Sequence, residues 1–269
     1  MKANIFQHEF QANLRSVITW SLSLAALILV FFSFFTSLAS SAAMLNQLMA
    51  QFPPELLEAF GMSGLDMSTV LGYFGLLFLF AQIFLAIQAG GYGFGLVSIE
   101  ESELTADFLI TKPVSRAQIL NSKLLAAFAS MLLTDLVFWV STLAAIALFG
   151  GGREVDLSTL TLLLFSVVIF QWFFLSVGLI ISLLVKRVRS VTPYALGLGF
   201  GMYVLSAFSG IGDVAALELI TPFKHFDARY IVQHGAYDLP LVALNVAVTV
   251  VSLVAVYWLY LRRDIPAVV

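Results

Sequence analysis

Six long runs of apolar residues, separated by short polar stretches, set the pattern of this chain. They cover residues 17–39, 67–97, 119–149, 160–185, 193–211 and 241–261. Each run has at least the roughly 17 residues that an α-helix needs to cross the hydrocarbon core of a bilayer. The pattern therefore predicts an all-α, polytopic integral membrane protein with six transmembrane helices, forming a single transmembrane domain over residues 1–269.

Two amphipathic stretches lie outside these spans. Residues 2–15 carry an apolar stripe at helical spacing, made of Phe6, Phe10 and Leu14 and continued by Val17. We predict a separate N-terminal interfacial helix here, with a plain extension of the first span as the alternative. In residues 40–66, a second apolar stripe is interrupted by Pro53 and Pro54, so we expect a partly embedded loop rather than a span.

The composition supports a membrane protein and narrows its partners. The chain is 61% hydrophobic and 11% charged, whereas soluble domains are about 45–50% apolar and about 25% charged. The net charge of −3 and the lack of a basic patch interleaved with aromatic residues argue against nucleic acid. The chain has no cysteine and its three histidines are scattered, so we predict no catalytic residues and no metal site.

The distribution of basic residues predicts the orientation. Ten of the 13 Lys and Arg residues fall at ends of the spans that would share one side of the membrane with the N-terminus. Basic residues are enriched on the cytoplasmic side of membrane proteins. We therefore expect a multi-pass protein of the cell membrane with cytoplasmic N- and C-termini. The segment 98–123 would then also be cytoplasmic.

The segment 98–123 is the most charged part of the chain. Its charged residues are Glu100, Glu101, Glu103, Asp107, Lys112, Arg116 and Lys123. Ser98 and Glu101 fit a capping box that begins a helix, and Ser115 and Gln118 fit a second one. Pro113 would end the first helix, because the residue before a proline avoids the α conformation. We expect a short helix at the membrane surface, which either docks a soluble partner or is a solvated connector.

The string EESELTADFLITKPVSRAQILNSKLL in this segment resembles the stretch after the second span in permease subunits of ATP-binding-cassette (ABC) transporters of the type-2 exporter class. Leu104 departs from the resemblance, since glycine is usual there. The string ITPFKHFDARYIVQHGAYDL, residues 220–239, is similar to the last outer loop of that family. With six spans, the resemblance covers nearly the whole chain.

The resemblance implies a cytoplasmic coupling helix between spans two and three, gripped by a separate cytoplasmic ATPase subunit. The implied coupling residues are Glu100, Glu101, Glu103, Leu104, Thr105, Phe108, Leu109, Lys112, Pro113 and Arg116. The chain would be a non-catalytic permease that moves a substrate, with export expected, and would pair with an identical or related second permease. It contains no G-x-x-x-x-G-K-[ST] phosphate loop, so ATP and Mg would bind to the ATPase and this chain would hold no cofactor.

Four glycines in the spans have the G-x-x-x-G spacing that lets membrane helices approach closely. They are the pairs Gly91 and Gly95, and Gly197 and Gly201. The spacing is compatible with packing inside one subunit and with a contact between two permease subunits.

Asp135 is the one acidic residue well inside a span. A charge there costs about 2.5–3.5 kcal/mol on insertion scales, so its side chain should face protein or water. It would either line a substrate path or bond a polar neighbour such as Gln82 or Gln171. Two alternatives to the ABC permease remain open: a secondary transporter or channel without an ATPase, in which Asp135 is the coupling acid, and a membrane enzyme or membrane-anchored assembly factor.

Overall fold

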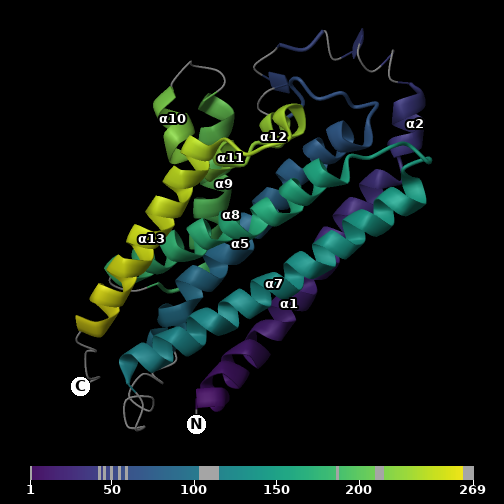
Figure 1. Ribbon diagram of the computed structural model, residues 1–269. Helices are drawn as coiled ribbons and strands as arrows, with labels where there is room; N and C mark the ends of the chain where they lie inside the picture. Colours follow the sequence, from purple (N-terminus) through teal and green to yellow (C-terminus); the bar gives the residue numbers. More distant parts are fainter. Residues whose placement is uncertain are drawn as a thin grey trace.

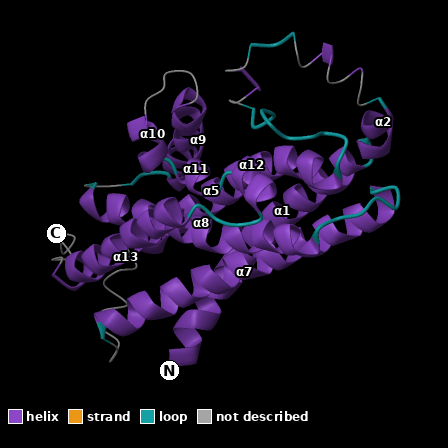
Figure 2. Ribbon diagram, turned by 45° about the horizontal axis from the view of Figure 1, so that its top comes forward, coloured by secondary structure: helices purple, strands orange, loops and turns teal. Residues whose placement is uncertain are grey.

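The computed structural model describes residues 2–41, 44, 47–48, 51–53, 56–57, 60–102, 115–185, 188–209 and 215–262, and within these ranges it contains helices and no strands (Figures 1 and 2). The helices are α1 (Lys2–Phe32), α2 (Phe35–Ser40), α5 (Val70–Ser102), α7 (Arg116–Phe149), α8 (Leu157–Leu184), α9 (Val191–Ser209), α10 (Ala215–Ile220), α11 (Pro222–His225), α12 (Ala228–His234) and α13 (Leu239–Arg262). Six of the helical segments are long and apolar enough to cross a membrane, namely α1 with α2, α5, α7, α8, α9 and α13. Each predicted span overlaps one of them.

The predicted N-terminal interfacial helix is not separate from the first span. α1 runs unbroken from Lys2 to Phe32, so the alternative, an extension of the span, is correct. No glycine or proline occurs in this stretch, so no residue interrupts the helical hydrogen bonds. The helix first breaks at Ser33 and Phe34, beyond which α2 continues the span.

The bundle has a central pair of helices, α5 and α8, flanked by less buried ones. α1 packs along α7, α9 packs on α5, and α13 packs on α8 (Figure 1). Large aromatic side chains fill the centre; Phe74, Phe78, Phe138, Phe170 and Phe174 are fully buried. α9 and α13 bury little of their surface within the chain, so most of their apolar side chains remain available to lipid or to another subunit.

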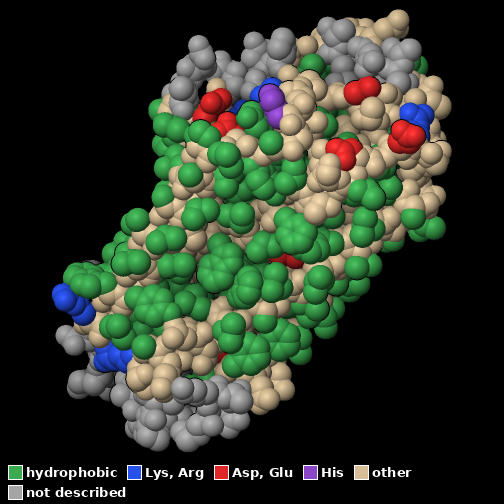
Figure 3. Space-filling view, in the orientation of Figure 1, with side chains coloured by type: hydrophobic (Ala, Val, Ile, Leu, Met, Phe, Trp, Pro, Cys, Tyr) green, Lys and Arg blue, Asp and Glu red, His purple; other side chains and the backbone are tan. Residues whose placement is uncertain are grey.

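The surface and the ends of the bundle fit a membrane protein. Hydrophobic side chains cover the middle of the face in Figure 3, and charged side chains gather mainly towards its two ends. The N-terminus and the C-terminal end of α13 lie at the same end of the bundle (Figure 1). α5 also ends there, and α7 begins there (Figure 1).

Candidate functional site

α7 begins at the end of the bundle that carries the termini, and its first turn is fixed by the chain's own side chains. Ser115 has an extended backbone, and its Oγ accepts from the Gln118 N–H at 3.3 Å. In return, the Gln118 Oε1 accepts from the Ser115 N–H at 3.4 Å. The second predicted capping box is therefore confirmed. It defines where α7 begins and satisfies two backbone N–H groups at the start of the helix.

The first predicted capping box is wrong. Ser98 lies inside α5, which continues to Ser102, whereas an N-cap residue must have a non-helical backbone. Glu100 and Glu101 are good helix formers that extend the span instead of starting a new helix. The side chains of residues 98–102 and all of Glu103, Leu104, Thr105, Phe108, Leu109, Lys112 and Pro113 lie outside the described residues. The coupling helix therefore stays a prediction.

Lys123 lies on α7 and is buried, contrary to the expectation that this charged segment faces water. Only 3% of its surface is exposed. Its Nζ donates to the Leu96 carbonyl of α5 at 2.7 Å and lies 3.5 Å from the Glu9 Oε1 of α1. A buried ammonium is tolerated when it is paired and hydrogen-bonded. Lys123 thus joins α7 to the two helices α1 and α5.

Two further polar contacts tie the start of α7 to α13. The Arg116 Nη1 donates to the Leu261 carbonyl at 3.4 Å, near the end of α13, where carbonyls lack partners within the helix. The Tyr257 hydroxyl of α13 donates to the Asn121 Oδ1. We call Arg116, Asn121 and Lys123 the α7 hub. Its contacts connect α7 with α1, α5 and α13.

Sequence reasoning missed Glu9 as a member of this site. Glu9 lies off the N-terminal apolar stripe formed by Phe6, Phe10 and Leu14. One signal was available: Glu9 is the only acidic residue among the first 54 residues. A single acid within a long apolar region favours an internal basic partner. Which basic residue that is could not be read from the sequence, because Lys123 is 114 positions away.

The glycines with G-x-x-x-G spacing differ from one another in how closely other helices approach them. A Cβ on Gly91 would make an ordinary contact with Ala195 at 3.9 Å, whereas no described atom lies within 4 Å of a Cβ built on Gly197 or Gly201. Gly197 and Gly201 therefore make no close packing contact with the described residues, and a contact between subunits stays a prediction for them. Gly95 lines a small cavity of about 60 Å³ together with Glu9 and Lys123.

Other glycines make the close helix contacts. A Cβ on Gly93 of α5 would lie 3.0 Å from the Leu179 nitrogen of α8, and even closer to the Leu175 oxygen. A Cβ on Gly199 of α9 would lie 2.8 Å from the Ile87 side chain of α5. These two glycines let α5 approach both of its main neighbours. No spacing in the sequence distinguishes these two glycines from the others.

Asp135 is buried inside the bundle, with 1% of its surface exposed. Gln82, one of the two predicted partners, instead donates to the Phe226 carbonyl at 3.0 Å. Gln171 of α8 lies close enough to interact with the Asp135 carboxyl group, although the contact falls outside the geometry of a regular hydrogen bond. Of the two predicted polar neighbours, Gln171 is therefore supported and Gln82 is not. The substrate path stays a prediction, and Asp135 lines none of the cavities named here.

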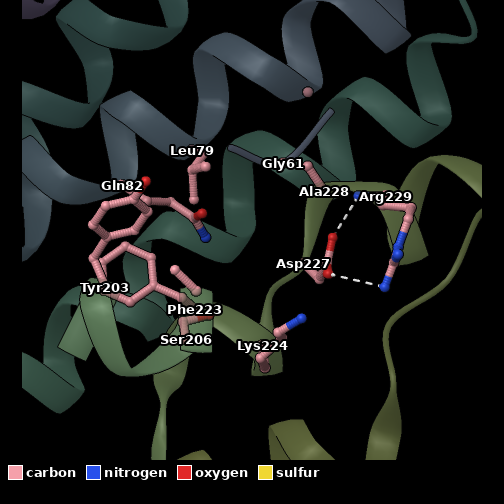
Figure 4. Close-up of a pocket in the computed structure, with 12 residues that line it drawn as sticks. Gly61, Leu79, Gln82, Tyr203, Ser206, Phe223, Lys224, Asp227, Ala228 and Arg229 are labelled. Carbon is pink, nitrogen blue, oxygen red and sulfur yellow. Dashed lines mark hydrogen bonds and ion pairs between the residues drawn. The ribbon is translucent and has the colours of Figure 1, made fainter. Parts of the chain in front are cut away.

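The opposite end of the bundle holds a water-sized cavity of about 40 Å³ between α5, α9, α11 and α12 (Figure 4). Its charged wall is structural: Asp227 begins α12 by accepting from the Arg229 N–H at 2.8 Å, and its carboxylate also lies 3.8 Å from the Arg229 guanidinium. Nearby, His225 is buried and bonded to the Leu219 carbonyl at 3.2 Å. The described residues contain no group of three or more His, Cys, Asp or Glu that could hold a metal ion.

Comparison with known proteins agrees with the architecture. The family model described as "ABC-2 family transporter protein" matches residues 3–265, nearly the whole chain. A search of curated proteins gave no match. The resemblance read from residues 98–123 is thus confirmed for the chain as a whole, and six apolar helices around a buried aromatic core are the corresponding structure. This multi-pass chain belongs to the ABC-2 family, as a non-catalytic membrane permease of an ABC transporter.

Proposed function

We propose that this chain exports a substrate using ATP that a separate cytoplasmic ATPase hydrolyses, and that the ATPase grips the segment between α5 and α7. Two copies, or this chain and a related permease, would form the membrane part of the transporter. ATP and Mg would bind to the ATPase, and the permease would make and break no covalent bond. Both termini would face the cytoplasm.

The observation that carries this proposal is the α7 hub. A force applied to the segment between α5 and α7 acts first on the end of α5 and the start of α7. There, the Lys123 Nζ bonds the Leu96 carbonyl and lies beside Glu9, and Arg116 bonds the Leu261 carbonyl. Hydrogen bonds that involve a charged group are directional and stronger than neutral ones. A displacement at this point would therefore be shared by α1, α5, α7 and α13.

Copurification tests the docking step. The full chain, expressed in its native cells and captured from solubilised membranes, should bring down an ABC ATPase that mass spectrometry identifies. Replacing Glu101 with Lys together with Phe108 with Ala should abolish this capture. The matched control combines Glu154→Lys with Phe165→Ala, which changes the same residue types at exposed positions elsewhere.

Two results would contradict the proposal. The first is capture of the ATPase at the wild-type level by the Glu101 and Phe108 double variant. The second is a permease that purifies alone and transports in vesicles with a proton gradient and no ATP. The second result would favour the secondary transporter instead.

A further inference from the structure

An apolar cavity of about 510 Å³ lies at the end of the bundle away from the termini. Phe31 and Leu38 line it from the first span, and Tyr73 and Leu76 line it from α5. Leu57 and Phe60 close it from the stretch that the sequence predicts to be a partly embedded loop. The cavity therefore lies between the spans and the described apolar side chains of this stretch.

Among the described lining residues, no polar side-chain group lacks a hydrogen-bond partner. The lining residues are Leu, Phe and Met side chains and Tyr73, whose hydroxyl already donates to the Phe31 carbonyl at 2.7 Å. A peptide segment that entered would bury its amide groups without hydrogen bonds, which costs several kcal/mol for each group in an apolar medium. A hydrocarbon chain carries no such groups, so the chemistry of the lining favours hydrocarbon over protein.

The size and the position of the cavity favour a lipid of the bilayer as its occupant. An engineered apolar cavity of about 150 Å³ binds benzene, so a cavity of about 510 Å³ accepts a considerably longer hydrocarbon. An α-helix is about 10–12 Å across with its side chains, so only about one turn of a helix would fit into the cavity. Phe31 joins the cavity to the outward surface of the first span, where Val30, Phe31 and Phe34 are 55%, 47% and 56% exposed. In a membrane, this surface contacts lipid.

We propose that this cavity is a binding site for one acyl chain of a bilayer phospholipid. The acyl chain would pack on Leu57 and Phe60 and would hold these two side chains against α1 and α5. Its headgroup would remain at the membrane surface. The site is independent of the proposed ATPase coupling, because it lies at the opposite end of the bundle from the α7 hub.

Photo-crosslinking tests the site. The full chain is reconstituted in phosphatidylcholine vesicles containing a phosphatidylcholine with a diazirine in the middle of one acyl chain, and the crosslinked residues are mapped by mass spectrometry. Crosslinks should concentrate on the cavity lining, several-fold above Val140 and Leu143, which are exposed apolar residues of α7. Leu57→Trp, which fills the cavity, should reduce the crosslinks at Leu76 several-fold. Leu143→Trp should leave them unchanged.

Two outcomes would overturn the site. One is labelling of the unsubstituted chain that is no stronger at the cavity than along α7, a result that holds even if Leu57→Trp does not fold. The other uses the absence of cysteine from the chain: a single cysteine at Leu57 or Phe60 that forms a disulfide between two copies in vesicles. That result would assign the cavity to a second copy of the chain.

Discussion

Gly93 sets how closely α5 approaches α8, so Gly93→Ala should separate the two helices. A Cβ there would meet only backbone: the Leu179 nitrogen at 3.0 Å, the Leu175 carbonyl carbon at 3.1 Å and, closer still, the Leu175 oxygen. Ordinary contacts begin at 3.4 Å. Backbone atoms cannot rotate aside as a side chain can. α8 must therefore move back by at least the difference between 3.0 Å and 3.4 Å, and further to clear the oxygen.

Two opposing contributions determine how much Gly93→Ala changes the free energy of unfolding. Overpacking a well-packed interior costs about 1–3 kcal/mol, and we expect the upper end because the clash is with backbone. Alanine is favoured over glycine in a helix by about 0.8–1.0 kcal/mol. Gly93→Ala should therefore lower the free energy of unfolding by about 2 kcal/mol. Gly197→Ala gains the helix preference and meets no described atom within 4 Å, so the free energies of unfolding of the two variants should differ by about 3 kcal/mol.

Equilibrium unfolding measures this difference. The purified chain in mixed micelles is titrated with SDS, and unfolding is followed by the fluorescence of its tryptophans, of which Trp172 lies on α8. Gly91→Ala is the control on α5 itself, since its Cβ would make only a 3.9 Å contact. If Gly93→Ala unfolds at the same SDS fraction as these controls, Gly93 does not set the approach of the helices.

Three other residues give separate tests. Lys123→Met should leave capture of the ATPase unchanged but lower ATP hydrolysis by the complex, because the Leu96 and Glu9 contacts are lost; unchanged hydrolysis would remove Lys123 from the coupling route. Asp135→Asn should keep the stability measured by SDS unfolding and impair transport in vesicles if Asp135 lines the path, whereas unchanged transport would favour a structural role. Burial lowers the pKa of His225 below its usual 6.5. The unfolded chain then binds more protons than the folded one, so stability should fall as pH drops below about 6.5, and His225→Gln should flatten that fall.

The number of spans and several helix ends could be predicted because they depend on local sequence. The length of each apolar run decides whether a helix crosses the bilayer, and the Ser115 capping box acts over three residues. α8 begins three residues before the predicted position 160, because Asp156 caps it by accepting from the Ser158 N–H. Polar residues in a first turn shorten the apolar run without shortening the helix.

The contacts between helices could not be predicted from the sequence. Glycine spacing defines one face of a helix, but it does not identify which other helix packs on that face. Gly197 and Gly201 have the recognised spacing yet face away from the described bundle, while Gly199 between them packs on α5. The same limit applies to Lys123. Its acceptor is the backbone carbonyl of Leu96, and every residue has such a carbonyl, so no pattern of residue types identifies it.

The burial of Lys123 divides the charged segment into two parts with different expected roles. Residues 98–114 are the part that a soluble partner would contact under the proposed function. Lys123 lies within the bundle and faces α1 and α5, so no partner reaches it. Variants in the outer part should therefore abolish capture of the ATPase, and with it all coupling. Lys123→Met, in contrast, should leave an assembled complex with lowered ATP hydrolysis. If the whole charged segment were one docking surface, variants of residues 98–114 and Lys123→Met would both lose capture of the ATPase. Capture of the ATPase by Lys123→Met therefore decides whether Lys123 belongs to the docking surface.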